Sequence, residues 1–111
     1  MRRAALALLA LTVAGCTSAA ETAYQADMDC FTFYYGVSPN SGSSEDITAR
    51  AAFRERAIAG GRTHRLSPEQ VESQARAGHA AFQARLNGMG AHSGEELLEE
   101  TNSACLARLR A

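Results

Sequence analysis

The residues that could carry metal chemistry in this chain are three histidines and three cysteines. No two of the histidines (His64, His79 and His92) stand three or four residues apart, so none share a helical face in the usual way. A zinc site needs three or four converging ligands, and no acidic residue forms a recognised ligand motif with these histidines. We therefore expect no metal site and no cofactor.

Serine is the other residue type that could do chemistry, as a nucleophile beside a base and an orienting group. Ser43, Ser67 and Ser93 instead stand where helices are expected to begin, and there a hydroxyl usually caps the helix. The sequence has neither a Gly-x-Ser-x-Gly elbow nor a phosphate-binding glycine loop. We expect no catalytic residues and no small-molecule substrate, and hence a protein that is not an enzyme.

The start of the chain has the order of an export signal. Arg2 and Arg3 precede an apolar run over residues 4–14, and Gly15 and Cys16 follow. The run is shorter than the roughly 20 apolar residues of a spanning helix and fits a secretory signal. Its end, Val13-Ala14-Gly15-Cys16, resembles the lipobox of bacterial lipoproteins.

In lipoproteins the cysteine thiol receives a diacylglyceryl group and the preceding peptide is removed. The resemblance implies that residues 1–15 are a signal peptide and that acylated Cys16 binds membrane lipid. Thr17 rather than aspartate follows, which in that family favours the outer membrane over the inner one. Cleavage after Ala20, with Ser18 as the second small residue, is the alternative, and it would give a soluble periplasmic protein.

Lipidation of Cys16 leaves Cys30 and Cys105 as the remaining cysteines, and an exported protein meets an oxidising compartment. The resemblance thus implies a Cys30–Cys105 disulfide. Such a bridge closes a long loop, for which chain entropy predicts a stabilisation of up to about 4.5 kcal/mol. The alternative is two buried free thiols that behave as small hydrophobic residues.

The charge balance excludes one class of partner. The formal net charge is −1, and removal of Arg2 and Arg3 with the signal leaves nine arginines against twelve acidic residues. Proteins that bind nucleic acid normally carry a strong basic excess, so we expect no nucleic-acid partner.

The charges that remain are clustered. Five arginines occupy positions 50, 54, 56, 62 and 65, and four glutamates occupy positions 95, 96, 99 and 100. Like charges four residues apart are neighbours on a helix surface, and such runs usually mark a solvated face. A dipolar surface that docks a charged partner is the functional alternative.

Four stretches have helical signals. Over residues 21–35, Tyr24, Met28, Phe31 and Tyr35 follow a four-three-four spacing. A second helix is expected to start near Ser43 and to stop at Gly60-Gly61. The third has Ser67 as cap, Pro68 at its first position and Gln70 completing a capping box, followed by a stripe at positions 71, 75, 78, 82, 86 and 89.

For the last helix, Ser93 and Glu96 predict another capping box, with Glu95 and Glu96 in the first turn and Arg108 and Arg110 in the last. Four amphipathic helices with short connections predict an all-α fold, a small antiparallel bundle whose first and last helices are joined by the disulfide. The domain organisation is then a signal peptide (1–15), a lipidated N-terminus and tether (16–22) and a helical domain (23–111).

These features together predict a non-enzymatic, lipid-anchored envelope protein that faces the periplasm and acts as an interaction or accessory module for an unidentified envelope protein. The alternative is a periplasmic chaperone or stress-protective protein. Small chaperones of that compartment are similar in architecture, being helical and held by one disulfide, although no motif of theirs is present.

Overall fold

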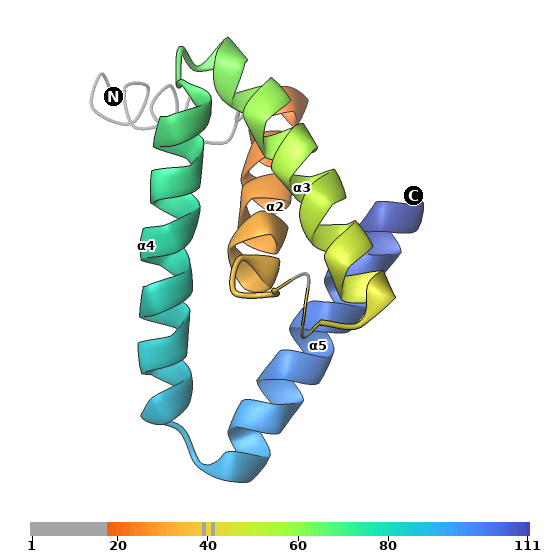
Figure 1. Cartoon of the computed structure of the whole chain (residues 1–111), viewed down its shortest axis with the longest axis vertical. Coiled ribbons are helices and arrows are strands. Elements are labelled where there is room, and N and C mark those ends of the chain that lie inside the picture. Colours follow the sequence, from red (N-terminus) through yellow and green to blue (C-terminus); the bar gives the residue numbers. More distant parts are fainter. Residues whose placement is uncertain (1–17, 39, 41) are drawn as a thin grey trace, which may run out of the picture.

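The protein is all-α, as predicted. The computed structural model describes residues 18–38, 40 and 42–111. They form four helices, α2 (Ala19–Tyr34), α3 (Ser44–Thr63), α4 (Pro68–Asn87) and α5 (Ala91–Arg110) (Figure 1). Neighbouring helices run up and down in turn, and a disulfide joins α2 to α5, so the predicted bundle is confirmed.

Three of the four helices begin with a serine cap. The Ser18 hydroxyl accepts a hydrogen bond from the Glu21 backbone N–H, and Ser43 caps α3 in the same way. Ser67 and Gln70 form the complete capping box that the sequence predicts. Because α2 starts at Ala19, its first turn lies inside the segment 16–22 that was expected to be a tether.

The predicted stop of α3 at Gly60-Gly61 is wrong, since the helix continues to Thr63. It ends in a Schellman motif, in which the Leu66 N–H donates to the Gly61 carbonyl and the Arg65 N–H to the Arg62 carbonyl. The left-handed residue is Arg65, with φ of 60°, where glycine is usual. The two glycines serve packing instead. A Cβ at Gly61 would lie 2.7 Å from the Val71 Cγ2 of α4.

The predicted start of α5 at Ser93 is also wrong. The helix begins at Ala91, with extended Gly90 as its N-cap and no side-chain cap bond. The first turn therefore holds no acidic residue, whereas Arg108 and Arg110 do occupy the last turn as predicted. Gly94 is buried, and a Cβ at this position would lie 3.9 Å from the Leu86 side chain of α4.

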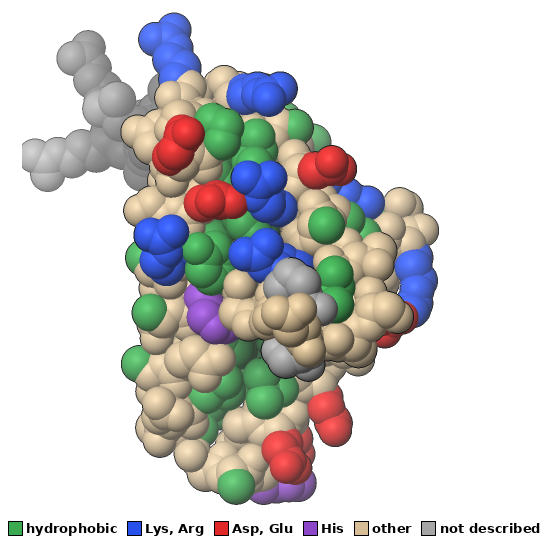
Figure 2. All heavy atoms as spheres, in the orientation of Figure 1, with side chains coloured by type: hydrophobic (Ala, Val, Ile, Leu, Met, Phe, Trp, Pro, Cys, Tyr) green, Lys and Arg blue, Asp and Glu red, His purple; other side chains and the backbone are tan. Residues whose placement is uncertain are grey.

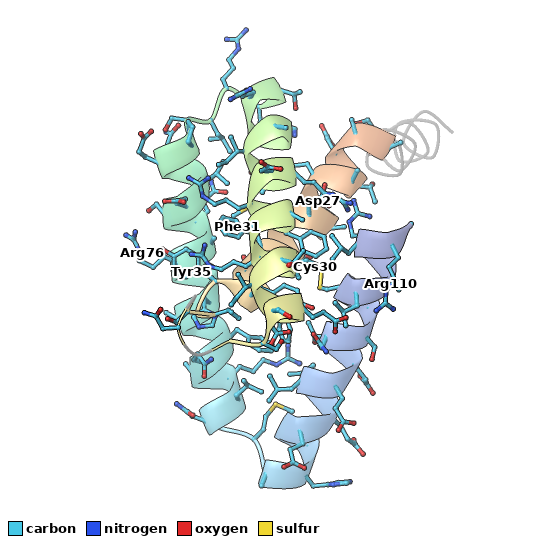
Figure 3. All side chains as sticks on the ribbon, turned by 45° about the vertical axis from the view of Figure 1, so that its right-hand side comes forward. Asp27, Cys30, Phe31, Tyr35, Arg76 and Arg110 are labelled. Atoms are coloured by element: carbon cyan, nitrogen blue, oxygen red, sulfur yellow. A yellow bond between two sulfur atoms is a disulfide. The ribbon has the colours of Figure 1, made fainter. Side chains whose placement is uncertain are left out.

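The core forms around α2, which packs against all three other helices. Phe31 and Tyr34 of α2, Phe53 of α3 and Val71 of α4 are the largest fully buried side chains. The Tyr34 and Phe53 rings stack 6.1 Å apart, and Phe31 points into the middle of the helices (Figure 3). Burying such side chains contributes about 1.5–3 kcal/mol each.

Helices α4 and α5 diverge from their shared turn, and α2 and α3 fill the space between them at the other end (Figure 1). At 20 residues α4 is about 30 Å long, whereas the 16 residues of α2 reach about 24 Å. The end of the α4–α5 pair at the shared turn therefore extends beyond α2, the helix that covers the rest of the pair.

The expected signal peptide and Cys16 lie outside the described residues. Within the part of the chain that the structure does describe, no helix combines the length and the apolar character needed to cross a membrane.

Candidate functional site

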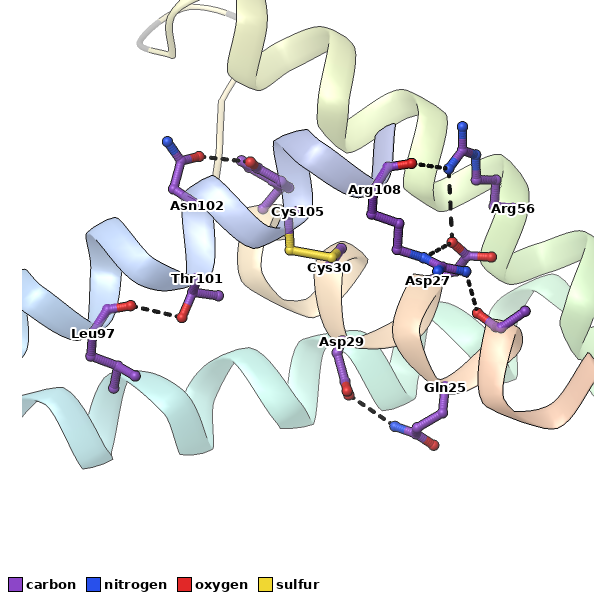
Figure 4. The surroundings of a disulfide bond; sticks show 12 residues. Gln25, Asp27, Asp29, Cys30, Arg56, Leu97, Thr101, Asn102, Cys105 and Arg108 are labelled. Atoms are coloured by element: carbon purple, nitrogen blue, oxygen red, sulfur yellow. Dashed lines mark hydrogen bonds and ion pairs between the residues drawn. A yellow bond between two sulfur atoms is a disulfide. The ribbon is translucent and has the colours of Figure 1, made fainter. Parts of the chain in front are cut away.

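Cys30 of α2 and Cys105 of α5 form a disulfide, as predicted (Figure 4). Their Cα atoms lie 5.6 Å apart and 75 positions apart in sequence. Both residues are buried, at 5% and 3% exposure, so the bridge belongs to the packed core. The free-thiol alternative is thereby excluded in this structure.

An ionic cluster lies one helical turn from the bridge. Asp27 is the one buried charged residue in the described chain, at 9% exposure. Its carboxylate accepts a hydrogen bond of 2.8 Å from Arg108 Nε, while Arg108 Nη2 donates to the Ala23 carbonyl (Figure 4). Arg56 of α3 lies 4.0 Å from the same carboxylate. This cluster joins α2, α3 and α5 at one point.

The arginines of α3 and of the turn after it divide into two groups. Arg50 donates to the Tyr35 carbonyl and lies over the Phe31 ring, Arg54 pairs with Glu72 of α4, and Arg56 contacts the end of α5. For these three the expected solvated face is wrong, because each is half-buried against another helix. Arg62 and Arg65 are exposed near the α3–α4 turn and form no ion pair with the described residues.

The glutamate cluster does form a solvated face. Glu95, Glu96, Glu99 and Glu100 are all exposed on the first half of α5. Of these four, Glu96 alone has an ionic contact with a described residue, at 3.1 Å from His92 Nε2 one turn earlier. Glu95 and Glu99 lie four residues apart, as do Glu96 and Glu100, and such like-charge pairs are mildly unfavourable for the isolated helix.

One concavity of the described chain follows α2, with α4 and α5 on its two sides. Phe33 of α2 and Phe82 of α4 meet edge to face, with ring centroids 5.9 Å apart, and line two hollows. The larger hollow has a volume of about 600 Å³ and reaches Met28 and Thr101. The smaller, about 340 Å³, reaches Leu98 and Asn102. We call these two hollows together the wedge.

Apolar side chains are accessible in the wedge. Leu98 is 39% exposed and is the one large hydrophobic residue classed as exposed in the described part of the chain. Phe33 and Phe82 are half-buried. Apolar atoms appear at the surface between the lower halves of α4 and α5 (Figure 2). Volumes of about 300–1,000 Å³ are typical of clefts that receive ligands or side chains.

The charged residues that line the wedge are mainly acidic. Asp29 and Arg85 border the larger hollow, and Asp46 and Glu99 border the smaller one. The carboxylate of Asp29 accepts from Gln25, whereas Arg85 forms no ion pair with the described residues. The wedge thus combines an apolar floor with an acidic rim.

Tyr24 borders the larger hollow at the opposite end. Its hydroxyl is buried without a hydrogen-bond partner among the described residues, and burial raises the pKa of this phenol. The ring lies against Gly60 and 4.8 Å from the His64 ring, centroid to centroid. A single orphan hydroxyl without a base and an orienting group beside it is not evidence of a catalytic group.

The three histidines are dispersed over the molecule. His64 lies against Tyr24, His79 Nδ1 lies 3.1 Å from the Thr32 carbonyl, and His92 pairs with Glu96. No group of three or more histidine, cysteine or acidic side chains in the described ranges could hold a metal ion.

Sequence reasoning missed the wedge and the Asp27–Arg108 pair. The wedge had a signal, because the apolar stripe at positions 71–89 is longer than the first helix can cover. Val71 and Ala75 at its start are buried, whereas Phe82 and Leu86 are only half-buried. The Asp27–Arg108 pair had no such signal, because nothing in the sequence distinguishes a buried aspartate in an amphipathic helix from a solvent-exposed one.

Comparison with models of known protein families, with curated proteins and with solved structures found no match.

Proposed function

We propose that this protein is a lipid-anchored envelope protein, held through acylated Cys16 and facing the periplasm, that acts by binding another envelope protein. The observation that carries the binding role is the wedge between α4 and α5, whose apolar floor is left uncovered.

The disulfide and the first helix support the anchored location. A buried disulfide fits an exported protein, because thiols are kept reduced in the cytosol. Cleavage before Cys16 leaves α2 intact with its Ser18 cap, whereas cleavage after Ala20 would remove the cap and the first two residues of the helix. Loss of such a cap costs about 1 kcal/mol.

The arrangement of polar groups favours binding over catalysis. The most buried ionic group, Asp27 with Arg108, lies between helices and holds the fold together, and the carboxylate is 9% exposed. The wedge is lined by phenylalanine, leucine and methionine together with amide, hydroxyl and mainly acidic side chains. An apolar cleft of this kind suits the side chains of a partner.

The anchor is tested by intact-mass measurement of the mature protein from membranes. We expect an N-terminal Cys16 that carries acyl chains, and we expect Cys16→Ser to yield soluble protein or unprocessed precursor. A mature, membrane-bound protein without acyl groups would contradict the anchor, and an N-terminus at Glu21 would select the soluble alternative.

The binding role is tested by photocrosslinking in intact cells. A photoreactive residue at Leu98 lies in the wedge, and one at Ser103 is the control, because Ser103 is exposed on the same helix and lines none of the hollows described above. We expect a discrete protein adduct from position 98 that position 103 does not give. Equal adducts from both positions, or none from position 98, would rule out the wedge as the binding site.

A further inference from the structure

We propose that the wedge receives an amphipathic helix with basic residues along its polar side, presented by an envelope partner. This inference rests on the proposed binding role and specifies the chemistry of the partner. Three properties of the wedge support it, namely its apolar floor, its length and its charge.

The apolar floor calls for a partner with regularly spaced large side chains. Phe33, Phe82 and Leu98 come from three different helices and converge on the two hollows. Hollows separated by an aromatic pair can each take a side chain from one face of a helix, where residues three or four apart are neighbours.

The length of the wedge fits a short helix. The residues of α4 that line the two hollows run from Gln74 to Arg85, or about 18 Å of helix. A partner helix of about three turns would match that span. Its apolar face would contact the floor and its flanks would face the two rims.

The rims select a basic partner. Three of the four charged residues that line the wedge are acidic, and Glu95, Glu96 and Glu100 stand exposed on the same half of α5. In the free protein the glutamates repel one another at four-residue spacing. Lysine or arginine side chains of a partner would turn that repulsion into attraction and would speed association at low salt.

The same charges disfavour a second copy of this chain as the occupant. Two wedges that interlocked would bring the acidic half of α5 from one copy close to the acidic lining of the other. Like charges across an interface oppose association, so a partner of opposite charge is preferred.

The test uses the exported Cys16→Ser protein, which carries the domain without acyl chains, and three synthetic peptides of about 14 residues. One is an amphipathic leucine–lysine helix, the second replaces lysine with glutamate, and the third has the composition of the first in a non-amphipathic order. Binding is measured by calorimetry and mapped by NMR chemical shifts. The matched variants Leu98→Lys and Ser103→Lys place the same charge on the same helix, inside and outside the wedge.

We expect the amphipathic lysine peptide to bind and to shift the signals of Phe33, Phe82 and Leu98, with weaker binding as salt rises. Leu98→Lys should weaken peptide binding about tenfold or more, since it removes an apolar contact and adds repulsion between like charges, whereas Ser103→Lys should change the affinity less than about twofold.

Equal binding of the glutamate peptide or of the non-amphipathic peptide would overturn the proposal. Dimerisation through Leu98 without peptide binding would assign the wedge to a second copy instead. If no peptide binds but position 98 still gives a discrete crosslinked adduct, the partner is not a basic helix, and the proposed binding role remains supported.

Discussion

Asp27 is expected to stabilise the fold, because its carboxylate is buried and holds Arg108 against α2. We expect Asp27→Asn to lower the free energy of unfolding by about 1–2 kcal/mol, since the half-buried guanidinium loses its counter-charge. Asp29→Asn is the matched control, because Asp29 is exposed and bonds only Gln25. It should change stability by less than about 0.5 kcal/mol. Urea unfolding measures both variants, and equal effects would show that the ion pair contributes nothing.

Tyr34 should make the fold sensitive to alkali. Burial, followed by the nearby charges of Asp46 and Glu45, raises the pKa of this phenol from 10.0 to about 12. Its hydroxyl donates to the Asn102 side chain at 2.7 Å, which only the neutral form can do. The stability that this phenol contributes is therefore fully present below about pH 10 and is lost as the pH rises towards 12.

Unfolding midpoints across this alkaline range test the Tyr34 contribution. Tyr34→Phe should be less stable than the parent near neutral pH but should lose less stability between about pH 10 and 12. Part of the loss of stability with rising pH will remain in this variant, because burial also raises the pKa of Tyr24. If Tyr34→Phe loses as much stability as the parent over this pH range, the alkaline sensitivity does not come from Tyr34.

At the scale of the helices, the sequence signals that matched the structure were local ones. Ser67, Pro68 and Gln70 predict the start of α4 because the cap is completed within four residues. The end of α3 and the start of α5 were mispredicted because Gly60-Gly61 was taken as a helix end and Ser93 as a cap, whereas Gly61 lies inside α3 and Gly90 is the N-cap of α5. Gly61 packs under Val71, and Gly94 packs against Leu86, and neither contact can be read from the residues nearby in sequence.

The left-handed residue that ends α3 offers a stabilising substitution. Arg65 has φ of 60°, a conformation that glycine adopts without steric cost. Arg65→Gly should raise stability by about 0.5–1 kcal/mol. Arg62→Gly, the same change within the last turn of α3, should lower stability by about the same amount. Thermal unfolding of both variants is the measurement, and shifts of the same sign would contradict the Schellman ending.

The buried glycine of α3 should tolerate little enlargement. In Gly61→Ala the new Cβ would lie 2.7 Å from a methyl group of fully buried Val71, so α3 and α4 must separate. We expect a loss of about 1–3 kcal/mol. Gly88→Ala is the control, because the nearest atom to its Cβ is 3.5 Å away and φ is −85°. Its effect should stay within about 0.5 kcal/mol, and a similar loss in both variants would disprove the packing role.

For the whole molecule, the fold class could be predicted from helical periodicity, and the bridge from the two cysteines that remain if Cys16 is lipidated as expected. The wedge could not, since it arises from how far α4 and α5 extend beyond α2 and in which directions they diverge. Those directions depend on contacts such as Phe33 with Phe82 and Asp27 with Arg108, which come from residues far apart in the chain.

The response of the whole domain to acid separates a binding module from an acid-activated chaperone. The Asp27–Arg108 ion pair holds α2 against α5, whereas the four exposed glutamates of α5 repel one another and do not hold the fold together. The Cys30–Cys105 bridge lies one turn from Asp27 and keeps α5 attached to α2 at any pH. We therefore expect the disulfide-intact protein at pH 3 to stay helical and monomeric, to bind no more ANS than at pH 7, and to leave the aggregation of a client protein unchanged. The double variant Cys30→Ser/Cys105→Ser is the control that should loosen at pH 3, because no covalent bond then holds α5 to α2. A disulfide-intact protein that gains ANS binding and protects the client at that pH would make the chaperone the better account of this fold.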